Sequence, residues 1–342
     1  MITAQWLACA VALAAAPAFG VTIDFATVGN PGNAPNPVNG WGAVSSVFQI
    51  AKYETTNTQY AEFLNMVDSA GVNPNGIYNA LMGSNAQGGI NFNSGAASGS
   101  KYTVKAGTNP NGVPYQSAPV VFTTWFSAAR FANWLGNGQQ SSAASMENGI
   151  YTLANRTSGT MPARNPGVGT QIALPSRDEW YKAAAYTGGS YVAISGTNTI
   201  TQTTLPAAAN FGGIQTPTFA SLAVGSYVST RSPYGLFDVL GNVTEYTDTA
   251  GTIDFDTGQP QVFSGSWVTA VLDIAAFHQS PGLFRGTTTA TGQVGFRVAE
   301  VQAVPEPGGM ILTATGVAWV LAVRGSVAGS AARRRGRGAR GG

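Results

Sequence analysis

Three stretches of the chain place apolar residues at the spacing of an α-helix. In the first, residues 56–67, the apolar positions follow the series i, i+3, i+4, i+7 and are Tyr60, Phe63, Leu64 and Val67. Thr56 and Gln59 stand before this series at the spacing of a capping box, in which two polar side chains satisfy each other's backbone N–H groups. The pattern predicts a helix that starts after Thr56 and buries one face.

The other two stretches repeat this arrangement. In residues 124–135 one helical face carries Trp125, Ala128, Phe131, Ala132 and Leu135. Gly136 predicts the end of that helix. Ser176 and Glu179 form another capping box, which predicts a third helix from there to Gly188.

Short runs of apolar and β-branched residues at 48–50, 262–268 and 295–298 predict strands. Stretches rich in Gly, Asn, Pro and Ser at 30–39, 84–100 and 158–169 predict loops. Few helices and many short strands joined by long loops indicate the α+β class. Because no repeat or linker divides residues 21–302, we expect one domain there.

The composition supports a loop-rich globular protein. Charged residues make up 9% of the chain and 44 of its 342 residues are glycine, which excludes a coiled coil and a disordered polyelectrolyte. Six of the 17 Lys and Arg residues lie in the last nineteen positions. The body, 21–303, has 11 basic against 14 acidic side chains, a balance of −3. Such a body is not expected to bind nucleic acid.

Cysteine and histidine each occur once, as Cys9 and His278. Cys9 lies in the N-terminal apolar run, so a body without that run has no thiol for a disulfide, a zinc site or a nucleophile. A single histidine excludes a multi-histidine metal centre. We interpret His278 as a solvated loop residue, because no catalytic motif surrounds it.

The N-terminus is typical of a secretory signal peptide. Residues 6–16 are apolar, and Ala18 and Gly20 supply the small residues that precede a cleavage site. A buried core helix is the alternative. We expect residues 1–20 to be a signal peptide and the protein to be exported.

The C-terminus, 303–342, has three parts in order: the motif VPEP at 304–307, an apolar run at 308–323 and an Arg-rich tail. This order resembles the PEP-CTERM sorting signal that bacterial exosortases process. The resemblance implies an exosortase as partner, a transient stay in the inner membrane through 308–323, and then a place at the cell surface or secretion. An ordinary tail anchor with a stop-transfer cluster is the alternative.

Five islands of sequence appear in a distinctive order along the body. They read FQIAKYETTNTQYAEFLN (48–65), APVVFTTWFSAARFANWL (118–135), ALPSRDEWYKAAAY (173–186), SPYGLFDVLGNVTEYTD (232–248) and SGSW with GFRV (264–298). Together they resemble the formylglycine-generating enzyme family, also known as the sulfatase-modifying factor family. The resemblance implies a C-type-lectin-like α+β fold, low in regular secondary structure.

The resemblance also implies an oxidase activity whose residues are missing here. Two cysteines bind copper in the family's oxidases, and Thr269 and Ile274 occupy the matching positions. Neither side chain offers the soft thiolate that Cu(I) prefers. We therefore expect no copper, no catalytic residue and no formylglycine-generating activity.

A calcium site is implied by the same resemblance. Its ligands would be the side chains of Asp238 and Glu245 and the carbonyl groups of Gly241 and Val243, a set of hard oxygen donors. The alternative is that the two acids cap the turn and pair with Arg297 or Arg231. A second family calcium site would begin at Asn210 and Phe211, but no acidic residue follows in 212–228.

Other candidates have simpler explanations. Asp254 and Asp256 lack the Gly and Glu of a calcium loop, which favours a solvated turn. Four tryptophans could stack on sugars, but their place in the islands favours the core: Trp125, Trp134, Trp180 and Trp267. By analogy, Arg130 and Arg297 are expected to pair with Glu54 or Glu179.

Three functions remain open: a non-catalytic module that binds a surface ligand such as extracellular polysaccharide, a structural matrix protein, and an oxidoreductase-type enzyme of unknown chemistry. The shortage of nucleophiles, bases and metal ligands favours the first two. We expect specificity to lie in loops 84–117 and 187–205.

Overall fold

Each of the three longer helices begins at a hydroxyl side chain that caps it. In the computed structural model, α1 (Asn57–Val67) follows Thr56, which accepts a hydrogen bond from the Gln59 N–H while Gln59 accepts one from the Thr56 N–H. Ser176 and Glu179 do the same for α5 (Arg177–Ala185). Both predicted capping boxes are confirmed.

The structure describes residues 20–165, 167, 169–192, 209–211, 220–251, 258–269 and 283–302.

Two helix ends differ from the prediction. Gly136 is the last residue of α3 (Trp125–Gly136) rather than its stop, and the N–H of Asn137 caps the helix on the Asn133 carbonyl. Helix α5 ends at Ala185, before Gly188, because Tyr186 is extended and forms a bridge with Tyr191. Three short helical segments were not predicted by the sequence pattern: α2 (Leu81–Ser84), η1 (Tyr115–Ser117) and α4 (Ala144–Glu147).

The first four-stranded sheet joins the two ends of the domain. Its order is β1 (Phe25–Val28), β2 (Phe48–Ala51), β10 (Ala299–Gln302) and β5 (Thr170–Ala173), and all its pairs are antiparallel. Ala299 lies opposite Ile50 on one side and Ala173 on the other. The last strand in sequence is therefore an inner strand of the sheet.

The second sheet has the order β8 (Leu283–Phe284), β7 (Pro260–Phe263), β6 (Thr244–Ala250) and β9 (Val294–Gly295). Strand β9 runs parallel to β6, and the other pairs are antiparallel. A separate hairpin consists of β3 (Ile90–Phe92) and β4 (Tyr102–Val104). These short strands and few helices confirm the predicted α+β class.

Three local predictions are only partly right. The strand predicted at 262–268 ends at Phe263, because Ser264 turns the chain at φ +76°. Of the strand predicted at 295–298, Gly295 is the last residue of β9, and residues 296–298 lie in the gap between β9 and β10. The loop predicted at 84–100 contains β3, since the short run at 90–92 pairs with β4.

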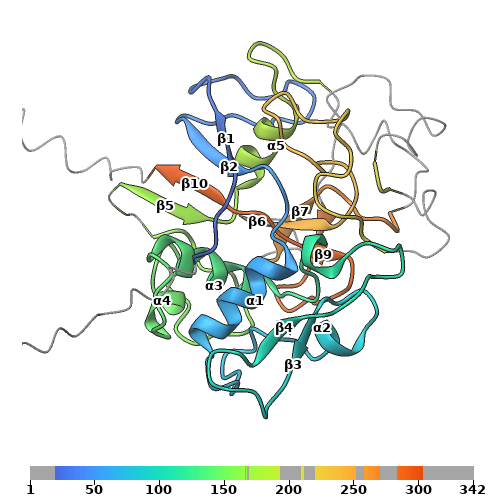
Figure 1. The fold of residues 1–342 in the computed structure, drawn as a ribbon. Helices are drawn as coiled ribbons and strands as arrows, with labels where there is room; N and C mark the ends of the chain where they lie inside the picture. Colours follow the sequence, from blue (N-terminus) through green and yellow to red (C-terminus); the bar gives the residue numbers. More distant parts are fainter. Residues whose placement is uncertain are drawn as a thin grey trace, which may run out of the picture.

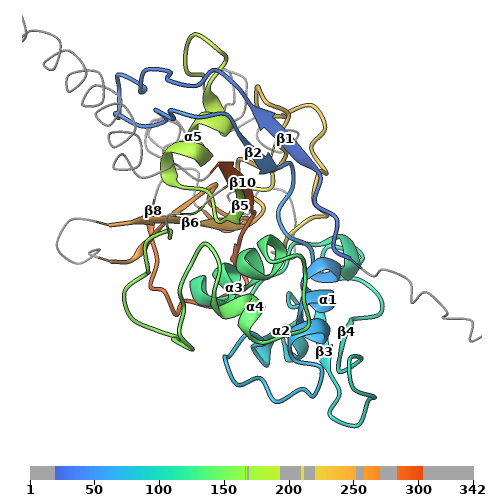
Figure 2. The same ribbon diagram turned by 90° about the vertical axis from the view of Figure 1, so that its left-hand side faces the viewer.

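The sheets lie between two groups of helices. In Figures 1 and 2, α5 lies on one side of strands β5, β6 and β10, and α1, α3 and α4 lie on the other. Helix α3 packs on β5, and α5 packs on β6. The four tryptophans proposed for the core are at most 5% exposed, which confirms that they pack inside the domain.

The buried arginines have partners other than those expected. Arg130 pairs with Glu147 at 2.6 Å, and Glu179 pairs with Arg164 at 2.7 Å. The expected pairing of Arg130 with Glu54 or Glu179 is therefore wrong. Glu147 lies on α4, a helix that the pattern did not predict, which is why the pairing was not foreseen.

The terminal segments expected to be a signal peptide, 1–20, and a sorting signal, 303–342, lie outside the described residues except for Gly20. Within the parts of the chain that the structure describes, no helix has the length and apolar character needed to cross a membrane.

Candidate functional site

The loop that precedes β6 has a backbone path that ordinary residues avoid. Asp238 and Asn242 have φ values of +54° and +59°, and Gly241 has +84°. A Cβ atom on Gly241 would lie 2.2 Å from the Asn210 carbonyl oxygen, so only glycine fits this close approach. The loop is thereby held against residue 210 while its side chains turn inward.

Asn242 connects this loop to two distant segments. Its Nδ2 donates to Glu54 Oε1 at 3.0 Å, and its Oδ1 accepts from the Leu222 N–H at 2.8 Å. Its own N–H donates to the Asn210 carbonyl at 2.7 Å. Because Asn242 is 1% exposed, these bonds fix Glu54 beside the loop in the interior.

Glu245 forms a fully buried ion pair with Arg297. Oε1 and Oε2 of Glu245 lie 2.5 and 2.6 Å from Nη2 and Nε of the guanidinium. Trp180 Nε1 donates to Oε2 at 2.7 Å. Glu245 was expected to be either a calcium ligand or a partner of Arg297 or Arg231, and the structure shows the pair with Arg297. Arg231 instead donates to the Val228 carbonyl.

Among the described residues, Glu54 and Asp238 are the acids of this region that form no salt bridge, and Arg297 acts on both only at longer range. Glu54 is 1% exposed, and its Oε2 has no hydrogen-bond donor in the described part of the chain. Burial raises the pKa of Glu54 well above its ordinary value, and the charges of Asp238 and Glu245 raise it further. Burial also raises the pKa of Asp238 to about 6, although the Gly225 N–H and Arg297 act against this.

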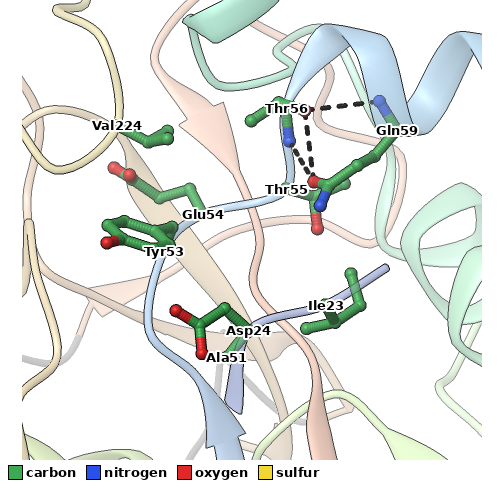
Figure 3. A pocket seen from close by; sticks show the side chains of 9 residues that line it. All are labelled: Ile23, Asp24, Ala51, Tyr53, Glu54, Thr55, Thr56, Gln59 and Val224. Carbon is green, nitrogen blue, oxygen red and sulfur yellow. Dashed lines mark hydrogen bonds between the residues drawn. The ribbon is translucent and has the colours of Figure 1, made fainter. Parts of the chain in front are cut away.

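A small cavity of about 60 Å³ lies beside Glu54. Figure 3 shows the Glu54 carboxylate turned toward Val224, with Tyr53 next to it and the Thr56–Gln59 capping box at the far side. From its sequence, Glu54 was expected only to pair with an arginine. The signal for a site is that this acid stands inside one of the five islands, directly before α1.

The calcium ligands implied by the family resemblance fit this geometry only in part. Both oxygens of Glu245 are engaged by Arg297, and the Gly241 carbonyl lies 2.8 Å from the Ser264 hydroxyl. Asp238 is freer, since its Oδ2 accepts one hydrogen bond, from Gly225. Among the described residues, no group of three or more His, Cys, Asp or Glu side chains is arranged to hold a metal ion. The acids that retain coordinating capacity are Asp238 and Glu54.

The model of the sulfatase-modifying factor enzyme 1-like domain matches residues 31–302. This chain belongs to the sulfatase-modifying factor family. No curated protein matches its sequence. The crystal structure of CarF superimposes with a TM-score of 0.53 at 20% identity, covering 83% of this chain and 99% of CarF. Treponema denticola variable protein 1 gives 0.52 at 17% identity, covering 82% and 96% of the two chains. These likenesses support the fold alone and agree with the predicted C-type-lectin-like architecture.

In this sulfatase-modifying-factor-like chain, the position of the first copper-binding cysteine is part of a turn. The Thr269 hydroxyl accepts a hydrogen bond from the Ser266 N–H at 2.7 Å, and the Thr269 N–H donates to the Ser266 carbonyl. Thr269 thus has a local structural role. Four other candidates lie outside the described residues: Ile274, His278, Asp254 and Asp256. Asn210, the first residue of the second family calcium site, donates a hydrogen bond from its Nδ2 to the Ala220 carbonyl at 3.0 Å.

Proposed function

We propose that this protein is an exported, envelope-associated member of the sulfatase-modifying factor family that binds polysaccharide and catalyses no oxidation. The proposal rests on the absence of cysteine from the domain. Cys9 is the only cysteine in 342 residues, and it lies outside the domain. Copper-dependent oxidation in the family needs a thiolate pair, and a hydroxyl occupied in a turn at Thr269 does not replace one.

The fold and its surface favour a binding role. The domain carries long neutral loops on a core of buried aromatic residues and ion pairs, and loops on a rigid scaffold are where proteins place recognition. A structural matrix protein is the second candidate, and an oxidoreductase of unknown chemistry is the third. The segments at 1–20 and 303–342 support export, processing by an exosortase and a transient inner-membrane anchor.

We also propose that Ca²⁺ strengthens the domain at the Asp238 loop. Asp238 and Glu54 would hold it, because they are the buried acids beside this loop that form no salt bridge, whereas Glu245 is paired with Arg297. A bound dication would supply the positive charge that two neighbouring carboxylates lack in a low-dielectric interior.

The test uses the purified full-length protein in detergent on a panel of immobilised polysaccharides, with calcium and with EDTA. Saturable binding supports the binding role, and folded protein without binding to any polysaccharide favours the matrix role. A parallel assay follows oxygen consumption with copper and a cysteine-containing peptide. Consumption above the protein-free rate would contradict the non-catalytic proposal.

A further inference from the structure

A groove of about 420 Å³ lies between two loops that are far apart in sequence. One wall comes from residues 34–38 and the other from residues 186–191, just after α5. The residues that line it are Ala34, Pro35, Asn36, Pro37, Val38, Tyr186, Gly189, Ser190 and Tyr191. The groove is remote in sequence from the family's cysteine positions and from the Asp238 loop.

Tyr191 is fixed in this groove as a rigid aromatic surface. Its ring stacks on Tyr181 of α5, with centroids 5.6 Å apart and planes inclined by 18°. Its hydroxyl accepts a hydrogen bond from Asn33 Nδ2 at 2.8 Å and donates one to the Ala34 carbonyl at 3.0 Å. With both ends of the side chain held, the ring is preorganised and loses little conformational entropy when a ligand stacks on it.

The opposite loop is anchored to the same helix. Asn36 Nδ2 donates to the Tyr181 hydroxyl at 2.7 Å, and the Asn36 Oδ1 accepts from the Val38 N–H. The indole of Trp41 meets Tyr181 edge-on at 5.8 Å. Tyr181 therefore holds both walls of the groove, and the groove keeps its width without a ligand.

The lining selects a class of ligand by its chemistry. None of the residues that line the groove is charged, and the nearby Asp178 and Lys182 are engaged by the Gly42 N–H and the Asn30 carbonyl. A phosphate or carboxylate would find no cation there. Two proline rings, the exposed Val38 and the half-buried Tyr191 offer apolar faces, while Ser190 and the backbone offer hydrogen bonds. An uncharged sugar ring has the matching combination of C–H faces and hydroxyl edges.

We infer that the groove between residues 34–38 and 186–191 binds an uncharged pyranose unit of a polysaccharide, stacked on Tyr191. This inference rests on the proposed polysaccharide-binding function and adds its location and the ligand class. The stacking of a neutral sugar explains why aromatic and proline rings, rather than charges, line a groove on a surface loop.

The experiment measures binding of full-length protein to dextran, laminarin, mannan and galactan as neutral probes and to alginate as a charged probe. The variants are Tyr191→Ala, Tyr191→Phe and Val38→Trp, with Phe92→Ala as control. Phe92 is an aromatic residue 40% exposed on the β3–β4 hairpin, outside the groove. Val38 is 66% exposed, so Val38→Trp narrows the groove without disturbing the core.

We expect at least one neutral polysaccharide to bind, with a tenfold or greater loss in Tyr191→Ala and Val38→Trp and little change in Phe92→Ala. Tyr191→Phe should show a smaller loss than Tyr191→Ala, because it keeps the ring but loses the two hydrogen bonds of the hydroxyl. If Tyr191→Ala does not fold, Val38→Trp decides alone. Wild-type binding that both groove variants retain would overturn the groove and leave the proposed function standing. Binding of alginate alone would overturn the ligand class. If wild-type protein binds none of the probes, the proposed function itself fails.

Discussion

The indole N–H of Trp180 and the guanidinium of Arg297 meet on one carboxylate oxygen, Oε2 of Glu245, at 2.7 and 2.6 Å. The three residues come from α5, from the segment between β9 and β10, and from β6. Arg297 also donates to the carbonyls of Ala51 and Phe237. One buried ion pair thus connects both four-stranded sheets, the Asp238 loop and the helix that covers them.

Removing one partner of this ion pair should strongly destabilise the fold. We expect Arg297→Met to lower the free energy of unfolding by about 3–5 kcal/mol, because it leaves a buried Glu245 charge without a partner. The double variant Arg297→Met with Glu245→Gln should recover part of that loss. Urea unfolding of the three proteins measures it. Equal stabilities of Arg297→Met and wild type would contradict the role given to the pair.

The close approach at Gly241 gives a second prediction with a control in the same loop. Gly241 and Gly235 have nearly equal φ values, +84° and +83°, but a Cβ at Gly235 would meet nothing within 4 Å. We expect Gly235→Ala to cost about 1–2 kcal/mol from backbone strain alone. Gly241→Ala should cost about 1–3 kcal/mol more, because the new methyl group collides with the Asn210 carbonyl. Similar losses in thermal or urea unfolding would show that the collision is relieved.

Glu179 predicts an acid-sensitive contribution to stability. Burial alone would raise its pKa, but Arg164 and the hydrogen bonds of Ser176 outweigh burial and hold the pKa below its ordinary value of 4.5. An acid with a lowered folded-state pKa stabilises the fold above its unfolded pKa, and this stabilisation is lost as the pH falls through the folded value. Asp248 and Tyr151 face the same Arg164, and the pKa of Asp248 is raised chiefly by burial.

The contribution of Glu179 is isolated by comparing wild type with Glu179→Gln, which can still accept the Ser176 N–H. We expect the wild type to be the more stable protein at pH 7 and the difference to shrink as the pH falls below about 4.5. Urea unfolding at several pH values measures the difference. A gap that stays constant down to pH 3 would show that the Arg164 pair does not carry it.

Calcium should stabilise the wild-type protein through Glu54. At a free concentration of about 100 times its Kd, a ligand of the folded state adds about 2.7 kcal/mol, and EDTA should remove that gain. Glu54→Gln should abolish the gain, and Glu62→Gln, at an exposed position on α1, should keep it. A gain of equal size in Glu54→Gln would show that calcium binds elsewhere, and no gain in wild type would contradict the calcium proposal.

The sequence predicted best where the cause of a structure is local. Thr56 with Gln59 and Ser176 with Glu179 fix helix starts through contacts three residues apart, so their spacing suffices. The strand predicted at 262–268 ends early because Ser264 has a positive φ. This conformation depends on groups distant in sequence, since the Ser264 hydroxyl donates to the carbonyls of Asp238 and Gly241. No local pattern contains that information.

The candidate sites show the same difference between features with a local cause and features that depend on distant residues. The island order predicted the family and the fold, and both are confirmed. The absence of copper, expected from Thr269 and Ile274, stays a prediction. The partner of Arg130 lay on an unforeseen helix. The tyrosine groove joins two segments separately expected to be loops, and the contacts that Tyr181 and Tyr191 make with residues 33–36 bring them together.

The inner position of β10 has a consequence for when the domain can fold. Until residues 299–302 have been synthesised, β2 and β5 each present an unpaired edge, because β10, the strand that pairs with both, is missing from the first sheet. Pairings that span most of the chain form slowly and late. For a protein exported as an unfolded chain this order is an advantage, because the first sheet cannot close, and the chain can still pass through a translocation channel, until its final strand arrives.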